Sequence, residues 1–130
     1  VVKGLVGAAP ICRDGGTIVS AAAMAEGIGG APFRGLLAAN ADLDDLVRRM
    51  AEPDWAPVPD QWQAEMLARA ARGRTIRLVS DGVPAADLAR CHVSPAASVE
   101  EAVAQALARH GRDATIAVIP KGPYVIPAVA

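Results

Sequence analysis

The sequence has 130 residues, the length of one ordinary domain, and 52% of them are hydrophobic against 21% charged. This composition excludes a disordered chain, which combines low apolar content with a high net charge. The 13 Lys and Arg residues and the 14 Asp and Glu residues leave a net charge of −1, so we expect neither a nucleic-acid nor an anionic-membrane partner. No apolar stretch reaches the roughly 18 residues of a membrane span.

The sequence begins Val1-Val2-Lys3, without a Met and without a charged leader followed by an apolar core. We therefore expect a fragment of a longer protein, located in the cytoplasm. Cys12 and Cys91 are too few for a disulfide scaffold, and neither belongs to a CxxC pair. We interpret each as a small buried residue or an idle thiol.

Short apolar runs alternate with helical patterns along the chain. Runs at residues 17–22, 75–80 and 114–119 predict buried strands, and a shorter strand is expected at 91–93. Helices are predicted by apolar spacing and by end signals such as Asp60, a candidate N-cap, and the capping box Ser98-Val99-Glu100-Glu101. The predicted helices cover residues 3–12, 32–39, 43–50, 60–72, 84–90 and 98–111.

This alternation predicts one α/β domain over residues 1–130, a three-layer α/β/α arrangement with a mainly parallel sheet of about four strands. Residues 52–59 are the longest irregular stretch, and residues 124–130 form either a short edge strand or a loose tail. Ligands of open parallel sheets bind beyond the carboxyl ends of the strands. We therefore expect the site among the loops 25–30, 81–84, 94–98 and 121–123.

The loop Glu26-Gly27-Ile28-Gly29-Gly30 could let backbone amides approach an anion, or it could be a purely structural turn. His92 and His110 lack metal-ligand spacing, so we expect no metal site and interpret His110 as structural, at a helix C-terminus. Neither a Ser-His-Asp nor a Cys-His arrangement is plausible. The residues alone indicate an α/β domain with an unknown ligand.

Three blocks of residues, in this order and spacing, resemble the C-terminal domain of the nickel-dependent lactate racemase family. The first holds Val2-Lys3-Gly4, Gly15-Gly16-Thr17-Ile18-Val19, Glu26-Gly27-Ile28-Gly29-Gly30 and Phe33. The second holds Pro59-Asp60-Gln61-Trp62-Gln63 and Leu78-Val79-Ser80-Asp81, and the third holds Ser98-Val99-Glu100-Glu101-Ala102 and Ile119-Pro120. The resemblance covers nearly the whole chain, and the Pro-Asp-Gln-Trp-Gln segment is its most specific part.

The resemblance implies a two-domain α/β enzyme, a racemase or epimerase of 2-hydroxyacids, of which this chain would be the C-terminal, cleft-closing domain. Such enzymes remove a hydride from the substrate carbon and return it to the opposite face. Their nickel pincer nucleotide is held by the N-terminal domain, which is absent here. The expected partners are therefore that missing domain and a small 2-hydroxyacid, and the 130-residue chain alone is expected to bind no cofactor and to catalyse nothing.

Two site residues carry over from the resemblance. Lys3 matches a lysine that the family offers to the active-site cleft, as a catalytic and substrate-binding residue, and Trp62 matches a substrate-binding indole that closes the same cleft. No cofactor or metal residue carries over. Without the resemblance, Lys3 would be an exposed terminal lysine and Trp62 could belong to the core. The rival functions are a free-standing module that binds a small anion or nucleotide at Glu26–Gly30, and a structural interaction domain.

Overall fold

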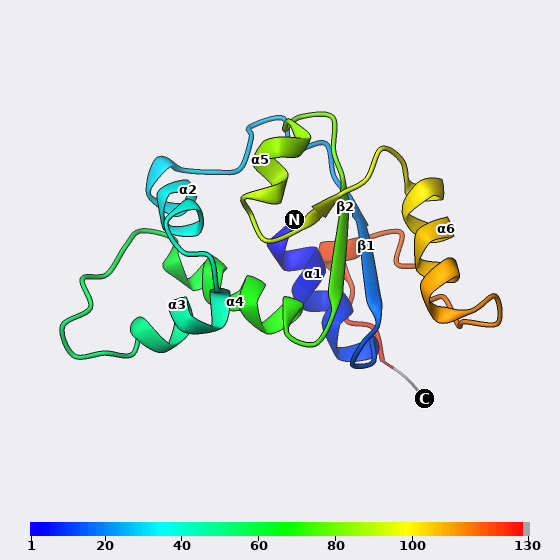
Figure 1. Cartoon of the computed structure of the whole chain (residues 1–130), viewed down its shortest axis with the longest axis horizontal. Helices are drawn as coiled ribbons and strands as arrows, with labels where there is room; N and C mark the ends of the chain where they lie inside the picture. Colours follow the sequence, from blue (N-terminus) through cyan, green and yellow to red (C-terminus); the bar gives the residue numbers. More distant parts are fainter. Residues whose placement is uncertain (129–130) are drawn as a thin grey trace.

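The structure, a computed structural model, describes residues 1–128 and has three parallel strands at its centre (Figure 1). Strands β1 (Thr17–Ala21), β2 (Thr75–Val79) and β3 (Ser94–Pro95) lie in the order β1-β2-β3. The pairing of β1 with β2 extends from Thr17 opposite Thr75 to Ala21 opposite Val79. The two residues of β3 pair with Arg77 and Leu78 of β2.

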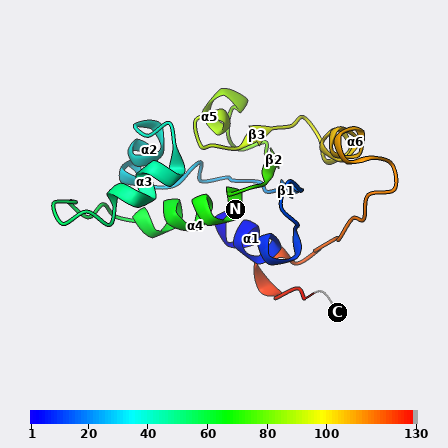
Figure 2. The same ribbon diagram turned by 60° about the horizontal axis from the view of Figure 1, so that its bottom comes forward.

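Helices lie on both sides of this sheet, so the predicted α/β fold with a parallel sheet is confirmed. Helices α1 and α4 pack together on one side, and α6 lies on the other side (Figure 2). The helices are α1 (Val2–Ala8), α2 (Ala31–Ala38), α3 (Leu43–Arg49), α4 (Gln61–Ala71), α5 (Ala85–Ala89) and α6 (Val99–His110), with 3-10 turns η1 (Ala9–Ile11) and η2 (Gly122–Tyr124). Within the described residues, no helix is both long and apolar enough to cross a bilayer.

The main core lies between the sheet and the α1–α4 side. Ile18, Ile76 and Leu78 point from the strands into a cluster that includes Leu5 of α1 and Leu67 of α4, all of them buried. Burial of such a side chain contributes about 1.5–3 kcal/mol to stability. Helix α6 adds only one buried residue, Ala102, which lies outside this cluster. Most of the hydrophobic stabilisation therefore comes from one side of the sheet.

Two helices begin at side-chain caps. The Asp42 carboxylate accepts from the backbone N–H of Asp44 at 2.8 Å and of Asp45 at 3.0 Å, at the start of α3. At the start of α6, Ser98 Oγ accepts from the Glu101 N–H at 3.1 Å, which confirms the serine half of the predicted capping box. The Glu101 carboxylate accepts from the N–H of Ala97, one residue before the cap.

Asp60 occupies the N-cap position of α4, as predicted, but without a side-chain cap. Its backbone is left-handed with φ 63°, and its side chain accepts no capping hydrogen bond. The neighbouring Gln61 N–H donates to the Val58 carbonyl instead. A tight turn therefore holds the N-terminus of α4, and Asp adopts the left-handed backbone of this turn more readily than most residues do.

The prediction of a strand at residues 114–119 is also wrong. The segment is irregular, and the side chains of Ile116 and Val118 are 55% and 80% exposed. A β-branched apolar run favours a strand only where a neighbouring strand pairs with it and covers it. Among residues 1–128 the parallel sheet therefore has three strands, one fewer than the approximate number that the sequence predicted.

Other predicted bounds shift by a few residues. The short strand expected at 91–93 lies instead at Ser94–Pro95, because His92 has a left-handed backbone (φ 59°) that turns the chain. The first helix ends at Ala8, before a 3-10 turn that contains Pro10. The segment 124–130 forms no strand up to residue 128, and its last two residues lie outside the described part.

Candidate functional site

A cavity of about 520 Å³ opens at the carboxyl ends of β1 and β2, the end of the sheet where the sequence predicts ligands to bind. Its walls come from the start of α1, the loop after β1, α4, and the region around α5. Apolar side chains predominate, including Leu5, Phe33 and Leu67. Glu26, Gln63 and Cys91 are the polar side chains of the lining. An apolar cavity with few polar groups suits a small organic ligand whose orientation those groups fix.

The loops around the cavity are tied to each other directly beyond the strands. Ser80, which follows β2, donates from Oγ to the carbonyl of Ala23 at 3.2 Å. Gly82 lies so close to the other loop that an added Cβ would be 2.2 Å from the Ala23 oxygen and 2.3 Å from the Met24 oxygen. Only glycine allows this approach, so the predicted loop 81–84 meets the chain directly before the predicted loop 25–30.

The glycine-containing loop 25–30 forms one wall of the cavity. Met24 begins it with a left-handed backbone, φ 49°, which is strained for a residue with a long side chain. Glu26 puts a carboxylate at this wall, and no Lys, Arg or His side chain is among the lining residues. A carboxylate without a cation repels an anion, so the geometry does not favour an anion or nucleotide site within the cavity.

In the Pro-Asp-Gln-Trp-Gln segment, the three consecutive residues Gln61, Trp62 and Gln63 at the start of α4 have different environments. Gln61 Oε1 accepts two hydrogen bonds, from Trp55 Nε1 at 2.9 Å and from the Val58 N–H at 2.7 Å, and so holds the proline-rich loop. Trp62 points outward and is 50% exposed. Gln63 lines the cavity. Sequence reasoning singled out Trp62 and missed both glutamines, although they flank it in the most specific motif of the chain.

Lys3 lies in the first turn of α1, with an exposed side chain. Among residues 1–128 it takes part in no ion pair. Its neighbours Val1 and Val2 line the cavity, as Gln63 does beside Trp62. Because α1 and α4 pack against each other, the structure brings the first turns of both helices to one cavity, with the side chains of Lys3 and Trp62 outside its lining.

Both histidine side chains lie beside polar atoms from distant parts of the sequence. His110 Nε2 lies 2.8 Å from Thr17 Oγ1, and His92 Nε2 lies 3.4 Å from the Leu37 carbonyl oxygen. Within residues 1–128 no group of three or more His, Cys, Asp or Glu side chains could hold a metal ion. The donor set of this part of the chain therefore does not fit a nickel centre, which needs several converging ligands.

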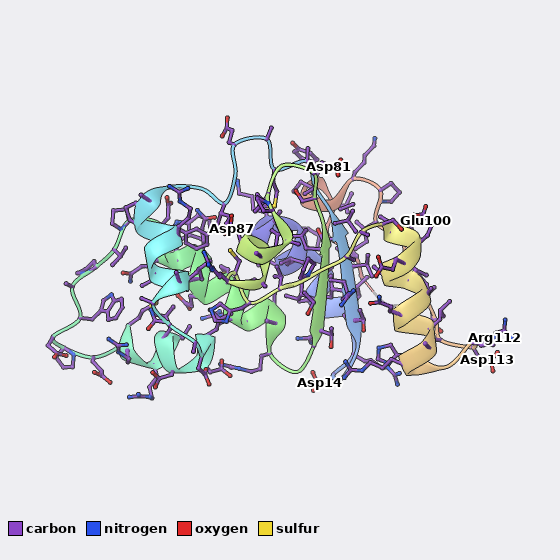
Figure 3. All side chains as sticks on the ribbon, turned by 45° about the horizontal axis from the view of Figure 1, so that its top comes forward. Asp14, Asp81, Asp87, Glu100, Arg112 and Asp113 are labelled. Carbon is purple, nitrogen blue, oxygen red and sulfur yellow. The ribbon has the colours of Figure 1, made fainter. Side chains whose placement is uncertain are left out.

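Cys91 is the thiol that lines the cavity. Burial raises the pKa of Cys91, and the negative charge of Asp87 on α5 raises it further (Figure 3). A raised pKa leaves less thiolate at neutral pH, and the thiolate is the nucleophilic form. Cys91 is therefore a poor nucleophile where it stands.

Comparison with known proteins identifies the family. The family model of the lactate racemase C-terminal domain matches residues 1–127. The chain belongs to this family. The resemblance noted from the sequence is thus confirmed over nearly the full length of the chain.

Two curated lactate racemases are similar to the chain. The enzyme of Lactiplantibacillus plantarum is 36% identical over 129 residues, and that of Thermoanaerobacterium thermosaccharolyticum is 32% identical over 126 residues. Each match covers 96% of this chain and 30% of the relative, so the chain spans about a third of the length of these relatives. The solved lactate racemase apoprotein from T. thermosaccharolyticum superposes with a TM-score of 0.86 over 96% of the chain and 30% of that structure, at 32% identity. The lactate racemase C-terminal domain thus accounts for the fold described above.

Proposed function

We propose that this chain closes the substrate cleft of a racemase or epimerase that acts on small 2-hydroxyacids. Family membership supports the enzyme class, and the 30% coverage of the relatives leaves room for an upstream domain that would be its partner. Residues 1–130 would then be one α/β domain of a two-domain enzyme, in the cytoplasm. The observation that carries the proposal is that the first turns of α1 and α4, which hold Lys3 and Trp62, meet beside one cavity at the carboxyl ends of the strands. The substrate carboxylate would lie at Lys3, outside the cavity lining that holds Glu26. Clefts between domains are common ligand sites.

The proposed reaction removes a hydride from the hydroxyl-bearing carbon of the substrate and returns it to the opposite face. The cofactor of the family, a nickel pincer nucleotide, would belong to the upstream domain, because the His and Cys residues of this chain do not fit a nickel site. This chain would contribute binding and the exclusion of water. Its apolar cavity supports the second role, because a dry site prevents side reactions of the oxidised intermediate.

Lys3 would bind the carboxylate of the substrate and act as the catalytic group of this domain. Its ammonium group is exposed and forms no ion pair among residues 1–128, so no internal partner competes with a ligand. A charge-assisted hydrogen bond of this kind contributes about 1.5–3 kcal/mol. The same charge would stabilise negative charge that develops on the substrate oxygen.

Trp62 would form an apolar wall of the closed cleft. Half of its surface is exposed in this chain, which leaves the indole accessible to a ligand or to the upstream domain. The other indole, Trp55, packs against the core and donates a hydrogen bond to Gln61. The two residues provide an internal comparison between an indole available for binding and one that holds the fold.

The test is lactate racemisation by the intact protein with its cofactor, measured beside thermal unfolding. Lys3→Ala should lower kcat/KM about 10- to 100-fold and change stability by no more than about 0.5 kcal/mol, whereas Lys121→Ala, at the other exposed lysine, should change neither. Lys3→Arg should restore the rate only in part, because a planar guanidinium does not replace a compact ammonium. Trp62→Ala should mainly slow turnover, and Trp55→Ala should mainly lower stability. An unchanged rate for Lys3→Ala, together with unfolding of Trp62→Ala, would contradict the site assignment.

The division of labour between the two domains has its own test. The 130-residue chain alone should show no racemisation and no stoichiometric nickel binding by calorimetry. Racemisation by the isolated chain, or a nickel site of submicromolar affinity in it, would refute the placement of the chemistry in the upstream domain.

A further inference from the structure

Among the described residues, the two large hydrophobic side chains with the highest exposure lie at η2 and directly after it. Tyr124 and Ile126 are 87% and 98% exposed, and Val125 between them is 41% exposed. Residues 122–128 read Gly-Pro-Tyr-Val-Ile-Pro-Ala and include no charged residue. Single exposed apolar residues are ordinary, but a group of large ones without a charge among them is typical of a surface that another protein covers.

The backbone that carries these side chains is held on α1, because α1 and η2 pack together. A Cβ added at Gly7 of α1 would lie 3.6 Å from the carbonyl oxygen of Gly122 and 3.9 Å from that of Val125. The segment therefore lies against the helix at van der Waals distance. Figure 2 shows η2, in red, on the side of α1 that faces away from the strands. Tyr124 and Ile126 are thus exposed on a supported surface of the domain.

The outer face of α1 continues this apolar surface. Positions i, i+3 and i+4 share one face of a helix, so Lys3, Val6 and Gly7 lie together on α1. Val6 is 37% exposed, whereas Leu5, on the opposite face, is fully buried in the core. The face of α1 that packs against η2 is therefore the face that carries Lys3. The α1–η2 patch is defined here as Val6, Tyr124, Val125 and Ile126.

We propose that the α1–η2 patch is the surface on which an apolar surface of the upstream domain docks in the intact enzyme. This inference rests on the proposed function, in which Lys3 faces that domain across the substrate cleft. Because Lys3 and Val6 share one face of α1, a domain that encloses a substrate at Lys3 also lies over Val6. Docking would cover the patch and leave Lys3 at the edge of the interface. An apolar occupant fits, since the centres of interfaces are depleted of charged residues.

The part of the enzyme outside this chain favours the upstream domain as the occupant. Each curated relative is covered over only 30% of its length, and the matching family model is that of a C-terminal domain, so the larger part of such an enzyme precedes α1. A domain joined by a short flexible linker has an effective concentration in the millimolar range, above that of a second copy in solution. A second copy of the protein is the main competitor for the patch, and the experiment below distinguishes the two.

Thiol labelling in the intact enzyme tests the docking surface. Tyr124→Cys and Ile126→Cys are made separately, and Ala108→Cys, at an exposed position of α6 on the other side of the sheet, is the matched control. The rate of alkylation is measured by mass spectrometry for the peptide that holds each new cysteine, so other thiols do not contribute. We expect both patch cysteines to react at least about tenfold more slowly than the control, because a covered side chain reacts only when the interface opens.

Two labelling results would overturn the proposal. One is alkylation at both patch positions that is no slower than at the control. The other is protection that disappears when the enzyme is diluted, which would assign the patch to a second copy.

Hydroxyl-radical oxidation of the unmodified enzyme gives a readout that does not depend on whether the cysteine variants fold. Tyr124 should be oxidised at least about tenfold more slowly in the native enzyme than in the unfolded enzyme, and equal rates would also overturn the proposal. Neither measurement uses racemisation. Slow labelling in an enzyme that racemises no 2-hydroxyacid would support the docking surface and refute only the proposed function, whereas fast labelling in an active racemase would refute only the docking surface.

Discussion

Gln61→Ala should destabilise the protein by removing the oxygen that holds the proline-rich loop. Gln61 Oε1 accepts from Trp55 Nε1 at 2.9 Å and from the Val58 N–H at 2.7 Å, and both bonds are partly buried. Each such bond contributes about 0.5–1.5 kcal/mol net, so the loss of both should cost about 1–3 kcal/mol. For a chain of 130 residues this corresponds to a fall in Tm of roughly 3–12 °C.

Gln61→Glu is the matched control, because a carboxylate keeps an acceptor at the same place. Gln61 is the first residue of α4, where a negative charge is also favoured by the helix dipole. We therefore expect the stability of this variant to stay within about 0.5 kcal/mol of the parent. The assay is urea unfolding followed by far-UV circular dichroism, with a shifted midpoint and an unchanged slope as the signature of lost stability.

A double-mutant cycle isolates the contact with the indole. Trp55→Phe keeps a ring in place of the indole and removes the N–H donor, so it should cost stability in the parent and little in the Gln61→Ala background. The coupling between the two changes should be about 1 kcal/mol. The reasoning fails if Gln61→Ala keeps parental stability, or if Gln61→Glu is as unstable as Gln61→Ala.

Three further outcomes follow from described contacts. Gly82→Ala should lower the free energy of unfolding in urea by about 1–3 kcal/mol, because the added Cβ would overlap two backbone oxygens. Gly4→Ala, in a helix with open space around this position, should instead raise the free energy of unfolding by about 0.5–1 kcal/mol. Thr17→Val should cost about 0.5–1.5 kcal/mol by removing the hydrogen bond to His110, and this cost should vanish in a His110→Ala background. Cys91 should react with iodoacetamide more slowly in the folded protein than in urea at neutral pH, because the pKa of its thiol is raised, and equal rates would contradict this.

Local signals predicted much of the fold. The strands at β1 and β2 fall within one residue of the apolar runs that predict them, and the capping box at Ser98 places the start of α6 correctly. These signals succeed because each depends on neighbours within a few residues. The fourth strand was predicted by the same kind of signal and is absent, since an apolar run shows that a segment could pair without showing whether a partner is in place.

The site was less accessible to sequence reasoning. The carboxyl ends of the strands were predicted to hold it, and the cavity lies there. Gln63 and Met24 line that cavity only because α4 and the loop after β1 meet in space, which no short-range pattern reports. The roles of Lys3 and Trp62 rest on the family resemblance and stay predictions. For Trp62, the spacing of apolar residues along α4 does not show whether the indole is buried or exposed.

The contact between α6 and the sheet also bears on how the chain folds. Thr17 and His110 are 93 positions apart. The segment that contains α2, α3 and α4 separates β1 from β2 in the sequence, so the pairing of these two strands closes a long loop. Pairings between distant parts of a chain close large loops before they gain any contact energy, which slows folding toward the millisecond-to-second range. Because α6 adds little to the main core, its docking should follow the transition state, so Thr17→Val should speed unfolding and leave the refolding rate nearly unchanged. During synthesis, β1 would therefore leave the ribosome long before α6 is available to form the contact between His110 and Thr17.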